Sequence, residues 1–219
     1  MTSSYRPTQV VRMAAAFIAA TLLSACGVSK LLDSKQPVDT LYVLSPPQSA
    51  AGSQSIAADL AVANPRVAPG LAGERIAVLK GRELNYYYGA RWGAELSQLV
   101  QSFIVRTLSA QGAFRSVASE DTRVASTYSL MIEVTHFQAE YADATAPQAH
   151  VALIGRLLRV SDRTLVNTLA AEASVPATSN RMSEVIAAFE QAAQKASTEL
   201  AERVADAARG DAAEEREAG

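Results

Sequence analysis

The chain has 219 residues, of which 49% are hydrophobic and 19% are charged, and its formal net charge is −2. This balance is typical of a globular protein, and the length suits one domain with extended ends. Because no stretch is strongly basic, the sequence lacks the electrostatic pattern of a nucleic-acid-binding protein. After the first 25 residues, no segment approaches the ~20 apolar residues that a membrane-spanning helix requires.

The first 25 residues have the three parts of an export signal. Arg6 and Arg12 supply positive charge, residues 13–23 form an Ala-rich apolar run, and Ser24-Ala25 leads directly into Cys26. The run is too short for a transmembrane helix. The position of Cys26 directly after this run argues against a buried structural cysteine. Residues 23–26 resemble a lipobox, which implies cleavage before Cys26, diacylglycerol on its sulfur, and acylation of the new amine with a fatty acid such as palmitate.

Lipidation of Cys26 leaves the mature chain with no free thiol, and therefore with no disulfide or cysteine metal site. Two acyl chains suffice for stable membrane anchoring. Gly27 stands where an aspartate would retain a lipoprotein at the inner membrane, so we expect an anchor in the outer membrane, at its periplasmic face. We interpret residues 1–25 as a signal peptide and the polar residues 26–38 as a lipidated tether to a domain that covers residues 39–209.

Eight strands are predicted by β-branched and aromatic residues bounded by Pro, Gly and Asn. They cover residues 40–44, 56–63, 75–79, 83–87, 114–117, 127–141, 148–160 and 164–175. The last three are long and follow one another through short turns, which favours an antiparallel meander. Alternation in residues 127–141 assigns one face of the strand to Tyr128, Leu130, Ile132 and Val134. Met131 and Phe137 are assigned to the opposite, open face. That open face is either a docking surface or a solvated surface.

Two amphipathic helices are predicted by apolar residues at three- and four-residue steps. The first covers residues 91–111, with Trp92 in the core and Gly112 at the C-terminal cap. The second covers residues 181–208, and residues 210–219 are predicted to form a disordered acidic tail. Because each helix must bury its apolar stripe, we expect an α/β (α+β) domain, with a single mixed, largely antiparallel sheet and both helices on one face.

The sequence contains no Gly-x-Ser-x-Gly elbow and no Walker-type phosphate loop, and its carboxylates show no paired spacing. The two histidines, His136 and His150, are positioned to face each other across a hairpin, but no further ligands at zinc spacing accompany them. We therefore expect no enzyme activity, no catalytic residue, no metal site, and no cofactor besides the covalent lipid on Cys26.

Aromatic residues are densest at Tyr86-Tyr87-Tyr88, just before Arg91-Trp92. Aromatic side chains favour interfaces because they combine large apolar area with polar tips, and they also suit a strand-to-helix corner. Since strand alternation directs at least one of the three tyrosines outward, Tyr86, Tyr87 and Tyr88 are the candidate partner-binding residues.

Three short motifs resemble one known family when they occur together behind a lipobox. They are Leu41-Tyr42-Val43-Leu44, the run from residues 75–78 through the tyrosines into Arg91-Trp92, and the strand over residues 128–134. These motifs, with the long C-terminal helix, resemble the ABC-type transport auxiliary lipoproteins (PqiC/YmbA-like). The resemblance spans nearly the whole mature chain, apart from a polar insertion near residues 48–55.

The resemblance implies a fold similar to the N-terminal domain of TolB and a non-catalytic role. Family members accompany an MCE-domain protein, a permease and an ATPase that move lipids between the inner and outer membranes. A structural subunit of another outer-membrane machine, such as a lipopolysaccharide translocon or a secretion ring, stays open as an alternative, as do an enzyme and a soluble-ligand binder. Homo-oligomerisation also stays open, and the resemblance defines no ligand pocket.

Overall fold

The computed structural model describes residues 38–47, 55–142 and 145–218. The expected signal peptide, Cys26 and the tether up to residue 37 lie outside the described residues. One compact unit covers Asp39–Gly219. In the described ranges, no helix is long and apolar enough to cross a membrane.

Nine strands join one sheet, and two α-helices accompany it in the described ranges. The strands are β1 (Thr40–Tyr42), β2 (Ile56–Val62), β3 (Arg66–Val67), β4 (Arg75–Lys80), β5 (Glu83–Trp92), β6 (Phe114–Ser119), β7 (Tyr128–Tyr141), β8 (Gln148–Arg159) and β9 (Leu165–Pro176). The helices are α2 (Leu96–Gln111) and α3 (Met182–Ala218), with a 3-10 turn at Glu120–Thr122. All eight predicted strands are present, and the two-residue β3 is the strand that the sequence did not predict.

The 14-residue strand β7 organises the sheet. One of its edges pairs antiparallel with β8 along nearly its whole length, and β8 pairs antiparallel with β9, so the predicted meander is confirmed. The other edge of β7 pairs in parallel with β2, β3 and β4 in turn. From there the sheet continues through β2 to β6, and through β4 to β5 and then β1 at the border.

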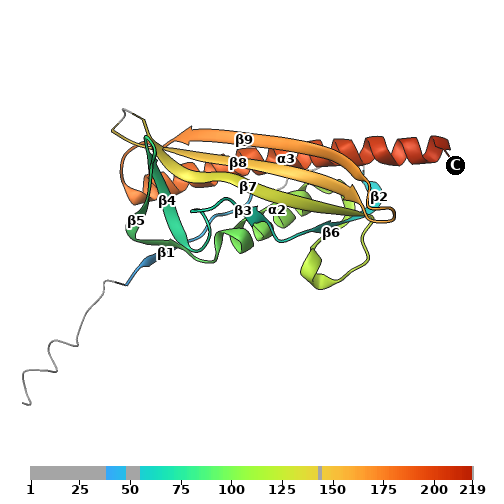
Figure 1. Cartoon of the computed structure of the whole chain (residues 1–219), viewed down its shortest axis with the longest axis horizontal. Helices are drawn as coiled ribbons and strands as arrows, with labels where there is room; N and C mark the ends of the chain where they lie inside the picture. Colours follow the sequence, from blue (N-terminus) through green and yellow to red (C-terminus); the bar gives the residue numbers. More distant parts are fainter. Residues whose placement is uncertain (1–37, 48–54, 143–144, 219) are drawn as a thin grey trace, which may run out of the picture. The chain divides into compact units, whose positions relative to one another are not determined.

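Both helices cover one face of this sheet (Figure 1), and the expected mixed arrangement is confirmed. Three aromatic rings, those of Trp92, Phe137 and Phe189, join the layers with ring centroids 5.2–5.6 Å apart. Trp92 is buried as predicted, but it ends β5 rather than beginning a helix, because α2 starts only at Leu96.

The helix α3 approaches the sheet closely at Gly155 of β8. A Cβ atom at this position would lie 2.9 Å from Cδ1 of Leu200 and 3.2 Å from Cδ1 of Leu130. Both leucines are fully buried. The glycine therefore lets the helix sit against the sheet at native packing density.

A β-bulge in β7 overturns one prediction about its faces. The pairing shifts from Val134↔Leu153 to His136↔Ala152, so one extra residue enters the strand and reverses the alternation. Phe137 is consequently buried in the core, and its predicted place on the open face is wrong. His136 takes the open face instead, on the same side of the sheet as the exposed Met131.

The predicted disordered tail is also corrected, because α3 continues through residue 218 (Figure 1). The carboxylate of Asp211 is buried. It accepts a 2.9 Å hydrogen bond from the hydroxyl of Tyr128 and lies 3.2 Å from Nη2 of Arg159. Acidic, Ala-rich composition suggested disorder, but this carboxylate is paired with groups at the end of the sheet.

Candidate partner-binding surface

The three candidate tyrosines lie on β5 in different surroundings. The hydroxyl of Tyr86 donates a 2.8 Å hydrogen bond to the carbonyl of Gly70. The guanidinium carbon of Arg75 lies 3.6 Å from the centroid of the Tyr86 ring, a cation–π contact. Tyr86 is therefore half-buried and held at both its tip and its face.

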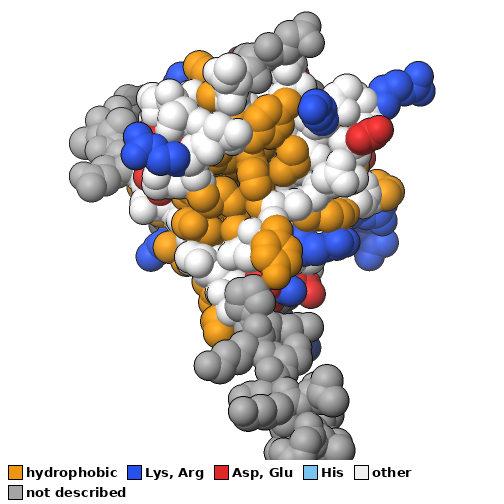
Figure 2. All heavy atoms as spheres, turned by 90° about the vertical axis from the view of Figure 1, so that its left-hand side faces the viewer, with side chains coloured by type: hydrophobic (Ala, Val, Ile, Leu, Met, Phe, Trp, Pro, Cys, Tyr) orange, Lys and Arg blue, Asp and Glu red, His pale blue; other side chains and the backbone are white. Residues whose placement is uncertain are grey.

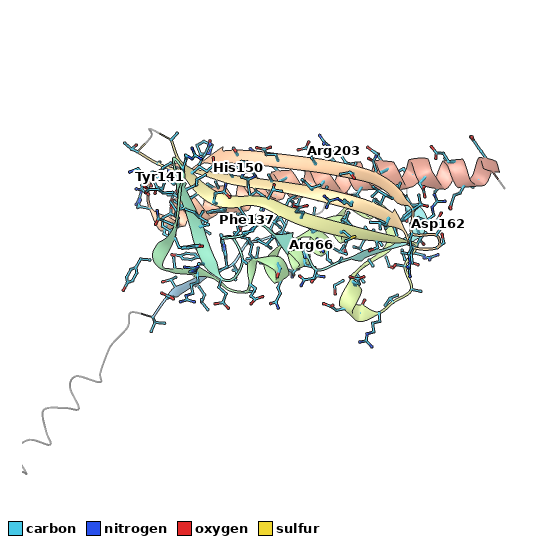
Figure 3. All side chains as sticks on the ribbon, in the orientation of Figure 1. Arg66, Phe137, Tyr141, His150, Asp162 and Arg203 are labelled. Carbon is cyan, nitrogen blue, oxygen red and sulfur yellow. The ribbon has the colours of Figure 1, made fainter. Side chains whose placement is uncertain are left out.

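Tyr87 connects β5 to two other parts of the domain. Its hydroxyl lies 3.2 Å from that of Tyr141, which donates to Oδ1 of Asn180 at 2.5 Å (Figure 3 labels Tyr141). Because the single proton of Tyr141 is used on Asn180, Tyr87 is the donor of the pair. Burial, followed by the contact with Tyr141, raises the pKa of Tyr87. Tyr87 thus has a structural role.

Tyr88 is free to contact a partner, since its side chain is 86% exposed. The next residue, Gly89, has φ 69°, a left-handed backbone conformation that glycine adopts without strain. Two residues after Tyr88, Ala90 pairs with Thr40 of β1. Tyr88 therefore lies beside the border strand of the sheet.

Two apolar side chains of the β1 segment are also exposed. Tyr42 and Leu44 turn inward and pack against the core, whereas Leu41 and Val43 are 63% and 73% exposed. Figure 2, which looks onto this end of the domain, shows hydrophobic side chains gathered there. We call Leu41, Val43 and Tyr88 the corner patch.

The charge beside Leu41 in the sheet is paired with carboxylates. Arg91, which pairs with Leu41 in the strand register, forms an ion pair with Asp39, and its Nη1 lies 3.9 Å from Glu74. The cation beside Leu41 is therefore engaged within the domain.

A groove of about 250 Å³ lies between residues 43–46 and α2. Leu99 and Phe103 form its apolar wall and Arg106 contributes a cation. Residues 43–46 form the opposite wall, and two hydrogen bonds hold them against α3. The amide of Ser45 donates to Glu190 at 2.8 Å, and the side-chain amide of Gln194 donates to the Ser45 carbonyl at 2.9 Å.

The two histidines stack on the open face, with ring centroids 4.4 Å apart and an interplanar angle of 17°, so the prediction that they face each other is confirmed (Figure 3 labels His150). Nδ1 and Nε2 of His150 lie 2.7 Å from Glu140 and Glu172 respectively. Burial raises the pKa of Glu140, but hydrogen bonds from His150 and Gln138 outweigh it, so the pKa is lowered.

These carboxylates have structural partners rather than free lone pairs directed into a cavity. Asp59 likewise accepts hydrogen bonds from Arg115 and from the hydroxyl of Ser116 (2.7 Å), which lower its pKa to about 2. Within residues 38–47, 55–142 and 145–218, no group of three or more His, Cys, Asp or Glu side chains is arranged to hold a metal ion.

Comparison with known proteins connects this fold to one family. A family model described as "ABC-type transport auxiliary lipoprotein component" matches residues 42–201. The crystal structure of a Xanthomonas campestris protein assigned to the family DUF330 is 29% identical with a TM-score of 0.72, and the match covers 79% of this chain and 99% of that chain.

Two more distant structures share the fold alone. An uncharacterised protein is 17% identical with a TM-score of 0.59, and the match covers 76% of this chain and 99% of that one. A hypothetical protein from Chlamydia trachomatis is 10% identical with a TM-score of 0.50, over 68% of this chain and 96% of that one. Among curated proteins, none matches the chain.

Proposed function

Because the chain belongs to the ABC-type transport auxiliary lipoprotein family, we propose that it serves an MCE-type ABC transport system that moves lipids between the inner and outer membranes. Its partners are an MCE-domain protein, a permease and an ATPase. The family match over residues 42–201 is the observation that carries this proposal. The auxiliary, non-catalytic role is that of the family.

The anchor belongs to the same proposal. Diacylglycerol on Cys26 holds the chain at the periplasmic face of the outer membrane, to which Gly27 directs it. The tether residues 27–37 span at most ~40 Å when fully extended. The domain therefore works close to its membrane, with the transport partner reaching it from the inner membrane.

Partner contact is assigned to the corner patch. Of the three candidate tyrosines, Tyr88 makes the contact, while Tyr86 and Tyr87 hold the corner in place through their bonds to Gly70 and Tyr141. Exposed tyrosine is among the residue types that contribute most to binding at interfaces, and Tyr88 is the most exposed of the three tyrosines.

The proposal is tested by extracting the native protein from membranes in mild detergent, recovering it through a C-terminal tag, and identifying co-purified proteins by mass spectrometry. Recovery of an MCE-domain protein with a permease or an ATPase supports the proposal. Recovery of a lipopolysaccharide translocon or a secretion ring, with no MCE-domain protein, overturns it in favour of a structural subunit of that machine.

Two variants test the corner. Tyr88→Ala is expected to reduce co-recovery of the partner with an unchanged Tm, since the side chain is exposed. Tyr87→Ala is expected to lower Tm, because it removes the bridge to Tyr141. Equal partner recovery with Tyr88→Ala and the unmodified chain would remove Tyr88 from the contact surface.

A further inference from the structure

The sheet ends at three strands, β1, β6 and β9, and the borders at β9 and β1 are protected unequally. An exposed edge strand is a template for pairing with another chain, and proteins usually cover it. Along β9, the helix α3 packs beside the strand, and the guanidinium of Arg203 donates to the backbone carbonyl of Ala170 (Figure 3 labels Arg203). A partner strand would have to displace this side chain to pair there.

The border at β1 has no such cover among the described residues. The carbonyl of Tyr42 accepts a 2.8 Å hydrogen bond from the amide of Gly93, so the backbone groups of Tyr42 face β5. Because successive residues of a strand direct their backbone groups to opposite edges, those of Leu41 and Val43 point away from β5. β1 pairs with β5 alone in the described part of the sheet.

The segment whose outer backbone groups are uncovered by described residues ends at Ser45, which is hydrogen-bonded to α3. Both backbone groups of Ser45 are bonded by α3 side chains, those of Glu190 and Gln194. β1 itself has three residues, but the alternation of exposed and half-buried side chains continues from Leu41 to Ser45. Within residues 40–47, an exposed apolar side chain therefore coincides with backbone groups that face away from β5 at Leu41 and Val43.

These features favour a polypeptide over a lipid surface as the occupant. Lipid cannot satisfy unpaired N–H and C=O groups, whereas an added strand pairs with both. Arg91, which pairs with Leu41 in the strand register, is bound to Asp39 and Glu74, so this cation is engaged within the domain rather than directed at anionic headgroups.

We propose that β1 receives an extended segment of the MCE-domain partner by strand addition, with apolar side chains of that segment beside Leu41 and Val43. Main-chain hydrogen bonds provide the affinity and the alternate side chains provide the selectivity in this mode of recognition. The inference rests on the proposed function for the identity of the partner, and it specifies how that partner is held.

The test uses the full-length lipoprotein in cells, with Val43→p-benzoylphenylalanine as a photocrosslinking probe. The matched control carries the same probe at Leu165 of β9, where the side chain is 53% exposed. A light-dependent adduct from position 43 to the MCE-domain protein, with none from position 165, is the expected result. An adduct only to a second copy of this chain, or only to lipid, overturns strand addition by the partner.

A second measurement separates backbone pairing from apolar contact. Leu41→Pro removes the outward N–H, and proline is tolerated at edge positions whose N–H faces solvent. Leu41→Val keeps that N–H and an apolar side chain. We expect Leu41→Pro to lower co-recovery about tenfold, the effect of losing an interface hot spot, while Leu41→Val retains it. Unchanged Tm shows that each variant is folded, and wild-type recovery with Leu41→Pro overturns the inference.

The two proposals fail in different ways. If the unmodified chain recovers the MCE-domain protein but Leu41→Pro recovers it equally well, the proposed function stands and strand addition is wrong. If the unmodified chain recovers no MCE-domain protein, the proposed function and the partner assigned to β1 are both overturned.

Discussion

Replacing Asp211 with alanine would measure how much the last turns of α3 contribute to the fold. The substitution removes the carboxylate from the Nη2 group of Arg159 and from the buried hydroxyl of Tyr128, which keeps only a long 3.4 Å hydrogen bond to the carbonyl of Ala208. An unsatisfied buried group costs about 1–3 kcal/mol, and breaking a buried ion pair costs about 3–5 kcal/mol. Because Arg159 keeps Glu215 as a partner, we expect a loss near the lower end, about 2 kcal/mol.

The assay is urea unfolding followed by circular dichroism, analysed for the free energy of unfolding. Asp206→Ala is the matched control, since Asp206 is an exposed carboxylate on the same helix that pairs only with Arg209 three residues later among the described residues. Its loss is expected within about 0.5 kcal/mol. If Asp211→Ala and Asp206→Ala unfold alike, the Asp211 contacts do not stabilise the domain and the reasoning is refuted.

Three further outcomes follow from the same structure. Gly155→Ala is expected to lower the free energy of unfolding by about 1–3 kcal/mol through overpacking against the buried Leu200; an unchanged urea midpoint would contradict this. Asp59 has a pKa of about 2, held below its ordinary 3.8 first by the hydrogen bond from Arg115. Its contribution is therefore full above pH 3.8 and lost as the pH falls through 2, so the Tm advantage over Asp59→Asn should disappear across that interval, and a constant difference would contradict it. Cys26→Ser is expected to abolish incorporation of labelled palmitate, and retained label would exclude lipidation at that residue.

Alternation predicted the sheet well wherever each strand keeps one phase. The three meander strands were predicted to within one residue at each end, because residues 127–141 alternate, residues 148–160 are mostly apolar on both faces as in a central strand, and turns separate the strands. The bulge in β7 was not predicted, because one inserted residue near Thr135 does not change the β-rich composition of the segment. The signal that was present is the spacing of Val134 and Phe137, three residues apart and both buried. In a regular strand, two residues three positions apart point to opposite faces, so both can be buried on one face only if the strand contains a bulge.

Burial by a distant partner could not be deduced from composition. Asp211 stands in an acidic, Ala-rich stretch, and its partners Tyr128 and Arg159 lie 83 and 52 residues away. Likewise, the tyrosine run predicted an interface, but the hydroxyl of Tyr87 is hydrogen-bonded to Tyr141, which belongs to a strand that begins 40 residues after the run. Long-range pairing decides which charged and aromatic residues are free, and that pairing is set by topology.

The β1 segment shows the opposite conflict between local pattern and position. Leu41-Tyr42-Val43-Leu44 is apolar on both faces, a pattern that predicts a strand covered on both sides. The topology instead places it at the border, where Leu41 and Val43 are exposed and their backbone groups face away from β5. Local choices in a natural sequence normally agree with the global fold, and the exceptions concentrate at functional sites. A segment that is patterned for burial but left uncovered by the described residues is best explained by a partner that covers it.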